Sequence, residues 1–315
     1  MSRPNHQAQP SADTHQGLLS GVLLGAHEAG LRDCWRQVHA ARLAGCVPLG
    51  PTTAEGRAAA PLPTGPMGAG MLSGGGQTPA VLVNRGIAVV DVVGPLSKGE
   101  DLYNWFFGTL TYGQLVEQVD QARRDVRVQA LMLRIDSPGG TVAGVSDLCE
   151  AILAFRAAKP VVAAVSDLAA SCGYQVACCA NRIFADRDAL IGCIGTLLVI
   201  DDVSRMYQDA GWTVRVFATE RDPYKGEGMP GAPLTAEQAD DFQRLVDQLG
   251  GEFIRSIYET RPAMRTGGMK LPDGRVYLAE DAVAKKLIDG VASWPKVLAA
   301  MQEGDLDGAA LAGGK

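Results

Sequence analysis

The stretch VQALMLRIDSPGG, Val128–Gly140, decides the fold class. Its first part, VQALMLRI, is an apolar run of the length expected for a buried β-strand. The part that follows, Asp136–Gly140, combines a proline with two glycines, and this composition ends a strand in a tight turn. A nearly continuous apolar strand is typical of a sheet that is covered on both faces, as parallel sheets are.

Predicted strands and helices alternate on both sides of this stretch. Upstream, the β-branched run Gly86–Val93 predicts a strand, and the helical spacing of apolar residues in Tyr112–Arg124 predicts a helix. Downstream we expect a helix at Thr141–Ala158, a strand at Pro160–Val165, a short apolar helix at Ala170–Ala180, and strands at Arg182–Ala185 and Trp212–Ala218. Such alternation requires right-handed crossovers between parallel strands. The predicted fold class is therefore α/β, a largely parallel β-sheet flanked by helices.

A long amphipathic helix is predicted after a loop rich in glycine and proline. Thr235 and Gln238 have the spacing of a capping box, which marks the start of a helix. Apolar residues then recur at helical spacing, at Phe242, Leu245, Val246, Leu249, Phe253 and Ile257. A stripe this wide packs against a hydrophobic core or against another subunit.

Composition divides the chain into four regions. Residues 1–47 form an N-terminal extension with one expected amphipathic helix, and residues 48–80 form a flexible linker rich in proline, glycine and alanine. Residues 81–303 hold the alternating strands and helices and form the main domain. Residues 304–315 are polar and rich in glycine, so we expect a flexible tail.

Charge and hydropathy exclude several classes of protein. Lys and Arg number 29 against 35 Asp and Glu, and the net charge of −6 argues against nucleic-acid binding through a basic surface. The longest apolar stretch, Ala189–Ile200, is shorter than the roughly 18 residues of a membrane span. The N-terminus lacks the charged start and cleavage site of a secretory signal, so we expect a cytoplasmic protein. The seven cysteines include no C-x-x-C pair, and we expect neither a metal nor a cofactor.

The histidines limit the chemistry that the main domain can perform. All four lie in the first 40 residues, at His6, His15, His27 and His39. A hydrolase in the main domain therefore needs a general base other than histidine.

Three segments at predicted strand ends carry groups suited to catalysis. The glycines of Asp136–Gly140 expose backbone N–H groups that could donate to an oxyanion, although ordinary turns have the same composition. Ser171 begins a predicted helix beside the N–H of Cys172, although serine is also a common helix N-cap. Lys225 lies in a glycine-rich loop and is either a solvated charge or, if buried beside Ser171, a neutral amine that acts as base. Lys159 precedes its strand and is expected at the opposite end of the sheet.

Five motifs follow one another along the main domain. They are D-S-P-G-G at Asp136–Gly140, A-A-S-x-G-Y at Ala169–Tyr174, I-G-x-I-G at Ile191–Gly195, Y-K-x-x-G-x-P at Tyr224–Pro230 and G-R-V-Y-x-x-E-D-A-x-x-x-x-L-I-D at Gly274–Asp289. In this order they resemble the signal peptide peptidase A family of serine peptidases, family S49. The resemblance covers about residues 85–295 and implies a ClpP/crotonase-like fold.

The resemblance also implies roles for individual residues. The family uses a serine and a lysine as its catalytic dyad, and the matching positions are Ser171 as nucleophile and Lys225 as general base. The oxyanion donors correspond to the backbone of Gly139 or Gly140 and of Cys172. The implied reaction is attack on a peptide carbonyl, followed by hydrolysis of the acyl-enzyme by a water that the lysine activates. Cys172 departs from the small residue usual after the nucleophile, and activity is in doubt if its side chain crowds the oxyanion site.

One further segment, G-T-L-T-Y-G-Q-L at Gly108–Leu115, is similar to the bacteriophage and prophage branch of that family. The members of this branch trim capsid and scaffold proteins during head maturation. The resemblance therefore implies protein or peptide substrates, a location in the host cytoplasm or the procapsid, and assembly into homo-oligomers. Three alternatives stay open at this point: protein degradation like that of signal peptide peptidases, a crotonase-like acyl-CoA enzyme, and a non-catalytic assembly protein.

Overall fold

The computed structural model describes most of the main domain. The described residues are 85–98, 111–222, 224–266, 271 and 273–313, together with the backbone of short strands at 23–24, 70–71 and 81–83. The helix expected in residues 1–47, most of the linker at 48–80 and the four histidines lie outside the described residues. The same is true of Gly108–Leu110 in the segment similar to phage proteins.

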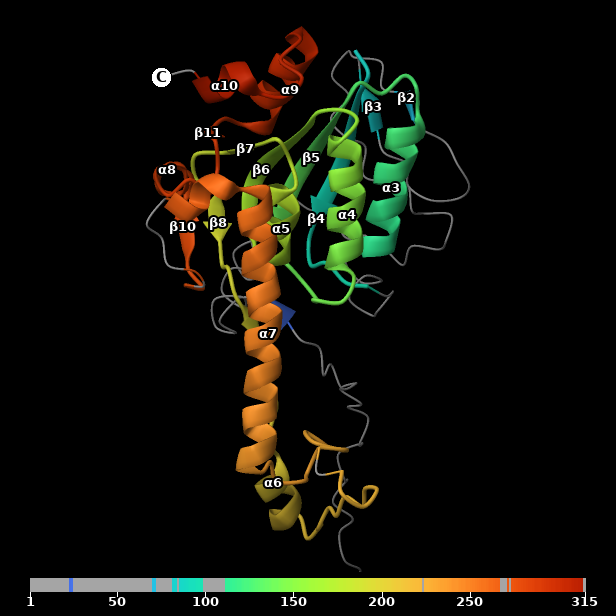
Figure 1. Cartoon of the computed structure of the whole chain (residues 1–315), viewed down its shortest axis with the longest axis vertical. Helices are drawn as coiled ribbons and strands as arrows, with labels where there is room; N and C mark the ends of the chain where they lie inside the picture. Colours follow the sequence, from blue (N-terminus) through green and yellow to red (C-terminus); the bar gives the residue numbers. More distant parts are fainter. Residues whose placement is uncertain are drawn as a thin grey trace, which may run out of the picture.

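One sheet of nine strands forms the centre of the described part of the chain (Figure 1). Its strands are β2 (Gly70–Met71), β3 (Val81–Val83), β4 (Ile87–Val93), β5 (Ala130–Ser137), β6 (Val161–Ala170), β7 (Arg182–Ala185), β8 (Leu190–Gly192), β10 (Val276–Leu278) and β11 (Gly290–Val291). The spatial order is β10-β8-β6-β5-β4-β3-β2, with β7 beside the first half of β6 and β11 beside β7. The central pairs β4–β5, β5–β6, β6–β7 and β6–β8 are parallel, which confirms the predicted α/β class.

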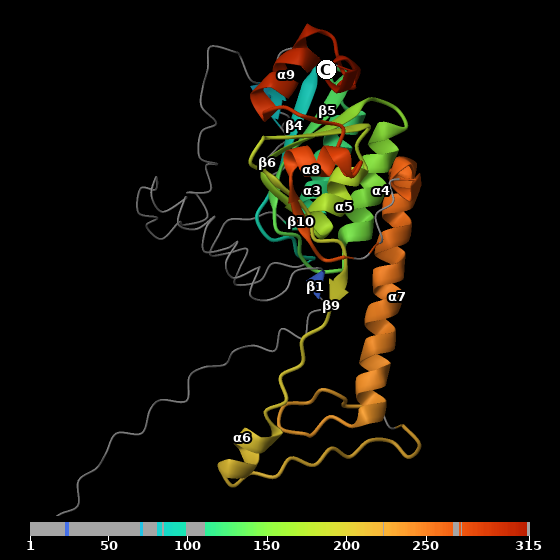
Figure 2. The ribbon, with the colours of Figure 1, turned by 90° about the vertical axis from the view of Figure 1, so that its left-hand side faces the viewer.

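Helices cover both faces of this sheet. The helices of the described residues are α3 (Tyr112–Arg124), α4 (Val145–Arg156), α5 (Cys172–Cys178), α6 (Ser204–Asp209), α7 (Ala236–Thr260), α8 (Ala279–Ala284), α9 (Trp294–Glu303) and α10 (Ala309–Gly313), with a 3-10 turn at Pro262–Thr266. Of these, α6 lies away from the sheet (Figures 1 and 2). Side chains of α3, α4, α5 and the end of α7 belong to the larger core on one face, and those of α9 belong to the smaller core on the other. Figure 2 shows α9 and α7 on separate sides of the strands.

The alternation of side chains along β4 explains why its sequence is apolar throughout. Ala88, Val90 and Val92 lie in the larger core, whereas Ile87 and Val89 lie in the smaller core with α9. Successive residues of a strand point to opposite faces, so a sheet with two covered faces needs apolar residues at every position. The sheet therefore has no solvent-exposed face at its centre.

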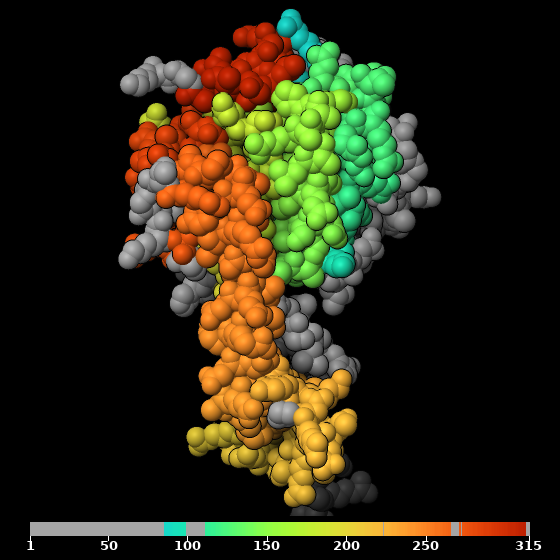
Figure 3. Space-filling view, in the orientation of Figure 1, coloured from blue at the N-terminus to red at the C-terminus, as the bar shows by residue number. Residues whose placement is uncertain are grey.

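A long projection leaves this body on one side, and we call residues 198–222 and 224–249 the arm (Figures 1, 2 and 3). It begins just after β9 (Thr196–Leu197), which pairs antiparallel with β1 (Leu23–Leu24), and it contains α6 and the first half of α7. Thr235 and Gln238 form the predicted capping box at the start of α7. The predicted stripe enters the core only in its second half, where Phe253 and Ile257 are buried, while Leu245 is 38% exposed on the arm.

Some elements differ from the predictions. The strand predicted at Trp212–Ala218 is wrong, because this extended segment lies on the arm and pairs with no strand among the described residues. Strand β6 continues to Ala170, so the following helix starts later than predicted, at Cys172. The C-terminal tail contains the short helix Ala309–Gly313. Among the described residues, no helix combines the length and the apolar composition needed to cross a membrane.

Candidate active site

Ser171 occupies a sharp turn between β6 and α5. Its backbone has φ 54° and ψ −125°, a conformation that a residue with a side chain rarely adopts and that stores strain. The turn is held by two hydrogen bonds, from the Ser171 N–H to the Gly192 carbonyl (2.9 Å) and from the Gln175 N–H to the Ser171 carbonyl (2.9 Å). The side chain is fully buried, and among the described residues its Oγ has no hydrogen-bond partner. The side chain of Ser171 therefore does not cap α5, and its hydroxyl is free for another role.

The turn after β5 packs directly against Ser171. A Cβ atom on Gly139 would lie 2.6 Å from the Ser171 Cβ and 2.9 Å from its Oγ, so only glycine fits there. The φ of Gly139 is 103°, which also favours glycine. Its N–H donates to Ser137 Oγ at 3.2 Å, whereas no described residue accepts the N–H of Gly140. Of the two glycines named from the sequence, Gly140 is thus the one with a free donor.

The side chain of Cys172 points into the larger core. Its thiol contacts the carbonyl oxygens of Gly140 at 3.7 Å and of Thr141 at 3.5 Å, and the residue is fully buried. Burial raises the pKa of this thiol to about 12, even though the neighbouring Tyr112 hydroxyl lowers it. The thiol is therefore protonated at neutral pH and acts as a hydrogen-bond donor.

Four of the five motifs meet around Ser171. Strand β8 pairs parallel with the end of β6 and antiparallel with β10, which brings Ile191–Gly195 and Gly274–Asp289 together beside the serine. Within this pairing Val276 is opposite Gly192, whose carbonyl accepts the Ser171 N–H. The D-S-P-G-G turn completes the group. These segments lie far apart in sequence, and the sheet order alone brings them to one edge.

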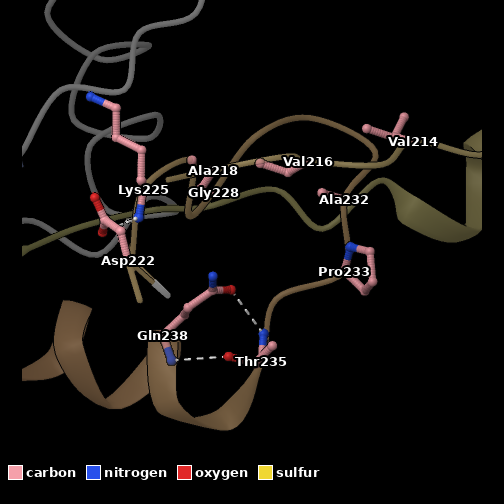
Figure 4. Close-up of a pocket in the computed structure, with 11 residues that line it drawn as sticks. Val214, Val216, Ala218, Asp222, Lys225, Gly228, Ala232, Pro233, Thr235 and Gln238 are labelled. Carbon is pink, nitrogen blue, oxygen red and sulfur yellow. Dashed lines mark hydrogen bonds between the residues drawn. The ribbon is translucent and has the colours of Figure 1, made fainter. Parts of the chain in front are cut away.

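The fifth motif, with Lys225, lies elsewhere in the chain. Lys225 is exposed on the arm and lines a cavity of ≈ 320 Å³ there, and Figure 4 shows its amine directed away from the other labelled residues. Gln238 lines the same cavity, while Ser256 on α7 accepts a hydrogen bond from Gln175 of α5 at 3.0 Å. These two positions on α7 are separated by about 27 Å along the helix. Within one chain the structure does not bring Lys225 and Ser171 together.

Two other lysines of the main domain, Lys159 and Lys98, lie elsewhere in the structure. Lys159 lies at the opposite end of the sheet, as predicted, and its amine donates to the carbonyls of Arg123 (3.1 Å) and Asp125 (3.0 Å). Lys98 is exposed beside the loop that follows Gly140, since its Cβ lies 3.3 Å from where a Cβ on Gly144 would stand.

Comparison with known proteins gives the family of this site. Residues 154–307 match the family described as Peptidase family S49. The chain carries a Peptidase family S49 domain. The matched residues include both Ser171 and Lys225, and the ClpP-like fold of the S49 family agrees with the parallel sheet flanked by helices.

Relatives of this S49 domain include both cellular and phage proteins. The chain is 29% identical over 227 residues to the chloroplastic serine protease SPPA of Arabidopsis thaliana, covering 71% of this chain and 32% of the relative. It is 31% identical over 195 residues to the head-tail preconnector protein GP5 of Enterobacteria phage P21, covering 61% of this chain and 38% of the relative. It is 25% identical over 240 residues to the capsid assembly protease C of Escherichia phage lambda, covering 76% of this chain and 54% of the relative. The matched part of the chain thus spans between a third and about half of the length of these relatives.

Proposed function

We propose that the chain is a serine endopeptidase in which Ser171 Oγ attacks the scissile carbonyl of a protein substrate. The observation that carries this proposal is the buried, strained Ser171 with an unpartnered hydroxyl against a glycine turn. The N–H groups of Gly140 and Cys172 then stabilise the oxyanion, and loss of either donor costs on the order of a hundredfold in rate. The acyl-enzyme that forms is hydrolysed by water in a second step.

We propose further that Lys225 is the general base and that it comes from a second copy of the chain. Lys225 lines a cavity with Gln238, which lies about 27 Å along α7 from Ser256, where α5 contacts this helix. A lysine side chain does not span that distance. The arm around it exposes large apolar side chains, among them Trp212 and Phe217, which are 67% and 89% exposed. Large apolar side chains that are exposed to this degree are typical of a protein interface. A neighbouring body on the arm would cover this surface and desolvate the amine, which favours the neutral form that accepts a proton.

The phage relatives suggest the biological role. Two of them are named as a capsid assembly protease and a head-tail preconnector protein. We propose that this chain likewise hydrolyses capsid or scaffold proteins during head maturation, in the host cytoplasm or the procapsid. The described part of the chain contains no group of His, Cys, Asp and Glu side chains arranged to hold a metal ion. No step of the proposed mechanism uses a metal ion.

A non-catalytic assembly protein is the second candidate function. The separation of Lys225 from Ser171 within one chain favours it, because the proposed base of an isolated chain then lies far from its serine. The family match, the strained serine turn and the free Gly140 N–H favour the peptidase. An experiment on paired variants separates the two candidates.

The test uses two variants that are each inactive alone. Ser171→Ala and Lys225→Ala are co-expressed with different tags, purified as mixed oligomers and assayed on unfolded casein. A dyad shared between chains restores up to about a quarter of the wild-type rate, the fraction of interfaces that pair an intact serine with an intact lysine. Lys98→Ala is the matched control and retains activity. Activity in Ser171→Ala alone, or casein left intact by wild type, overturns the peptidase; a mixture as inactive as its parts overturns the shared dyad.

A further inference from the structure

Cys172 and Tyr112 contact the same short piece of backbone, which we call the oxyanion loop and define as Gly139–Thr141. The Tyr112 hydroxyl donates to the Thr141 carbonyl at 2.9 Å, and the Cys172 thiol contacts the same oxygen at 3.5 Å. The thiol also contacts the Gly140 carbonyl at 3.7 Å. Both side chains are buried, with 0% and 1% exposed for cysteine and tyrosine.

The opposite side of the oxyanion loop is held by Leu96. Its N–H donates to the Gly139 carbonyl at 2.8 Å, and its carbonyl accepts the Thr141 N–H at 2.9 Å. In a trans peptide the N–H points opposite to the preceding carbonyl. The bond to Gly139 therefore directs the Gly140 N–H away from Leu96. Contacts on both sides leave this N–H as the donor of the loop that no described residue accepts.

Tyr112 also packs against the residues that follow the loop. A Cβ on Gly144 would lie 2.8 Å from the Tyr112 Cδ2, so the ring packs closely against the backbone where α4 begins. Tyr112 is in turn fixed by its own N–H, which donates to the Ser97 carbonyl at 2.9 Å. The tyrosine thereby links the end of β4, the oxyanion loop and α4.

We propose that Cys172 and Tyr112 are positioning residues that hold the Gly140 N–H in place for the oxyanion of the reaction. This inference rests on the proposed function of Ser171. Cys172 links the two halves of the oxyanion site. Its own backbone N–H is one proposed donor, and its side chain contacts the loop that bears the other. The residue that departs from the family pattern thus contacts the loop that bears the second donor.

The chemistry of the two groups suits this role. Burial is the largest cause that raises the pKa of the Cys172 thiol to about 12 and the pKa of the Tyr112 hydroxyl far above its ordinary value. Both groups keep their protons throughout the neutral range and can donate to carbonyl oxygens. A glycine or alanine at position 172 offers no such donor.

The first arm of the test measures the order of the loop directly. Hydrogen exchange of peptides covering residues 138–144 is compared between wild type, Cys172→Ala and Tyr112→Phe. Matched controls are Cys178→Ala, a buried thiol of the same helix, and Tyr174→Phe, a buried hydroxyl that donates to the Leu287 carbonyl at 2.8 Å. We expect faster exchange in the loop of the two test variants and unchanged exchange there in the controls.

The second arm measures reactivity with a fluorophosphonate, followed by intact mass and peptide mapping of Ser171. Small displacements of a catalytic group cost about tenfold in rate, so we expect kinact to fall about tenfold in each test variant with KI unchanged. The controls stay within about twofold even where their melting temperature falls. The double variant loses less than the product of the single losses, because both groups act through the Thr141 carbonyl.

The outcomes separate the inference from the proposed function. Faster loop exchange together with lower kinact supports the inference. Wild type that is labelled at Ser171, with test variants that match it in exchange or in kinact, overturns the inference and leaves the peptidase standing. Wild type that is not labelled overturns the peptidase and the catalytic role inferred from it, and the exchange data then assign the contacts to stability alone.

Discussion

Gly139 lies so close to Ser171 that a methyl group on its α-carbon would stand 2.6 Å from the serine Cβ. A similar contact exists one step further along, where a Cβ on Gly173 would lie 2.9 Å from the Ser137 carbonyl oxygen. Real carbon atoms do not approach so closely, so the turn after β5 and the turn after β6 interlock through two glycines. The position of the serine is therefore set by the neighbouring strand as well as by its own.

This interlock predicts the effect of Gly139→Ala. The added methyl collides with Ser171 and also requires an unfavourable positive φ, so we expect at least a hundredfold loss of fluorophosphonate labelling and a loss of roughly 1–3 kcal/mol in the free energy of unfolding. Gly274→Ala is the matched control, because it has φ 63° and no atom within 4 Å of the added Cβ. The control should lose about 1 kcal/mol and keep its labelling rate. Equal labelling by both variants would contradict the prediction.

The buried ion pair between Arg261 and Asp289 predicts a large loss of stability for Asp289→Ala. Arg261 donates to both carboxylate oxygens, at 2.9 and 3.1 Å, and is 9% exposed. Removal of the carboxylate leaves a buried guanidinium unpaired, which costs about 3 kcal/mol in the free energy of unfolding. Asp209→Ala, which breaks an exposed pair of 4.0 Å with Arg205, should cost less than about 0.5 kcal/mol. Urea unfolding of both variants measures the difference, and similar losses would refute it.

The two halves of the α7 stripe predict opposite phenotypes. Phe253→Ala removes a buried ring and should lower the free energy of unfolding by about 3–5 kcal/mol. Leu245→Glu lies on the exposed part of the arm and should leave the unfolding of the single chain within about 0.5 kcal/mol of wild type. On the proposed function it should nevertheless lower both the molecular mass in solution and the proteolytic rate. Light scattering and a casein assay test this, and an unchanged mass with an unchanged rate would exclude this part of the arm as an interface.

The buried thiols predict a loss of stability at alkaline pH. Burial raises the pKa of Cys172 and of Cys178 from 9.0 to about 12. Between these values the unfolded chain has lost protons that the folded chain retains, so stability falls as the pH rises from 9 towards 12. The slope is at most about 1.4 kcal/mol per pH unit for each thiol. Thermal unfolding under reducing conditions should show a shallower fall for the double variant Cys172→Ala/Cys178→Ala than for wild type. Parallel curves would speak against two protonated buried thiols.

Local patterns predicted much of the body of the molecule. The apolar runs at Gly86–Val93 and Val128–Ile135 correspond to β4 and β5, with β5 shifted by two residues. The capping box at Thr235 and Gln238 starts a helix, and all these signals depend on residues close in sequence. The end of β6 was predicted too early. By its local pattern the segment Asp167–Ala170 precedes a helix, but its residues Leu168–Ala170 pair with β8 and extend the strand. A local sequence pattern does not predict such pairing.

The site was predictable in part for the same reason. The serine and the glycine turn follow strand ends, and parallel strands bring their carboxyl ends to one edge of a sheet. The position of Lys225 depends on where a long loop and half of α7 extend, and no spacing in the sequence encodes that direction. Tyr112 gave no signal beyond starting a helix, because its contact with Thr141 joins residues that are 29 positions apart.

Because of the arm, the rate of hydrolysis per chain should depend on the concentration of the protein. On the proposed function each chain carries a serine without its base and a lysine without its nucleophile, so a single chain is catalytically inactive. The rate of hydrolysis should then rise more steeply than in proportion to the amount of protein until assembly is complete. Newly synthesised chains at low concentration would not cleave the proteins around them. Cutting would begin where many copies have gathered in one place.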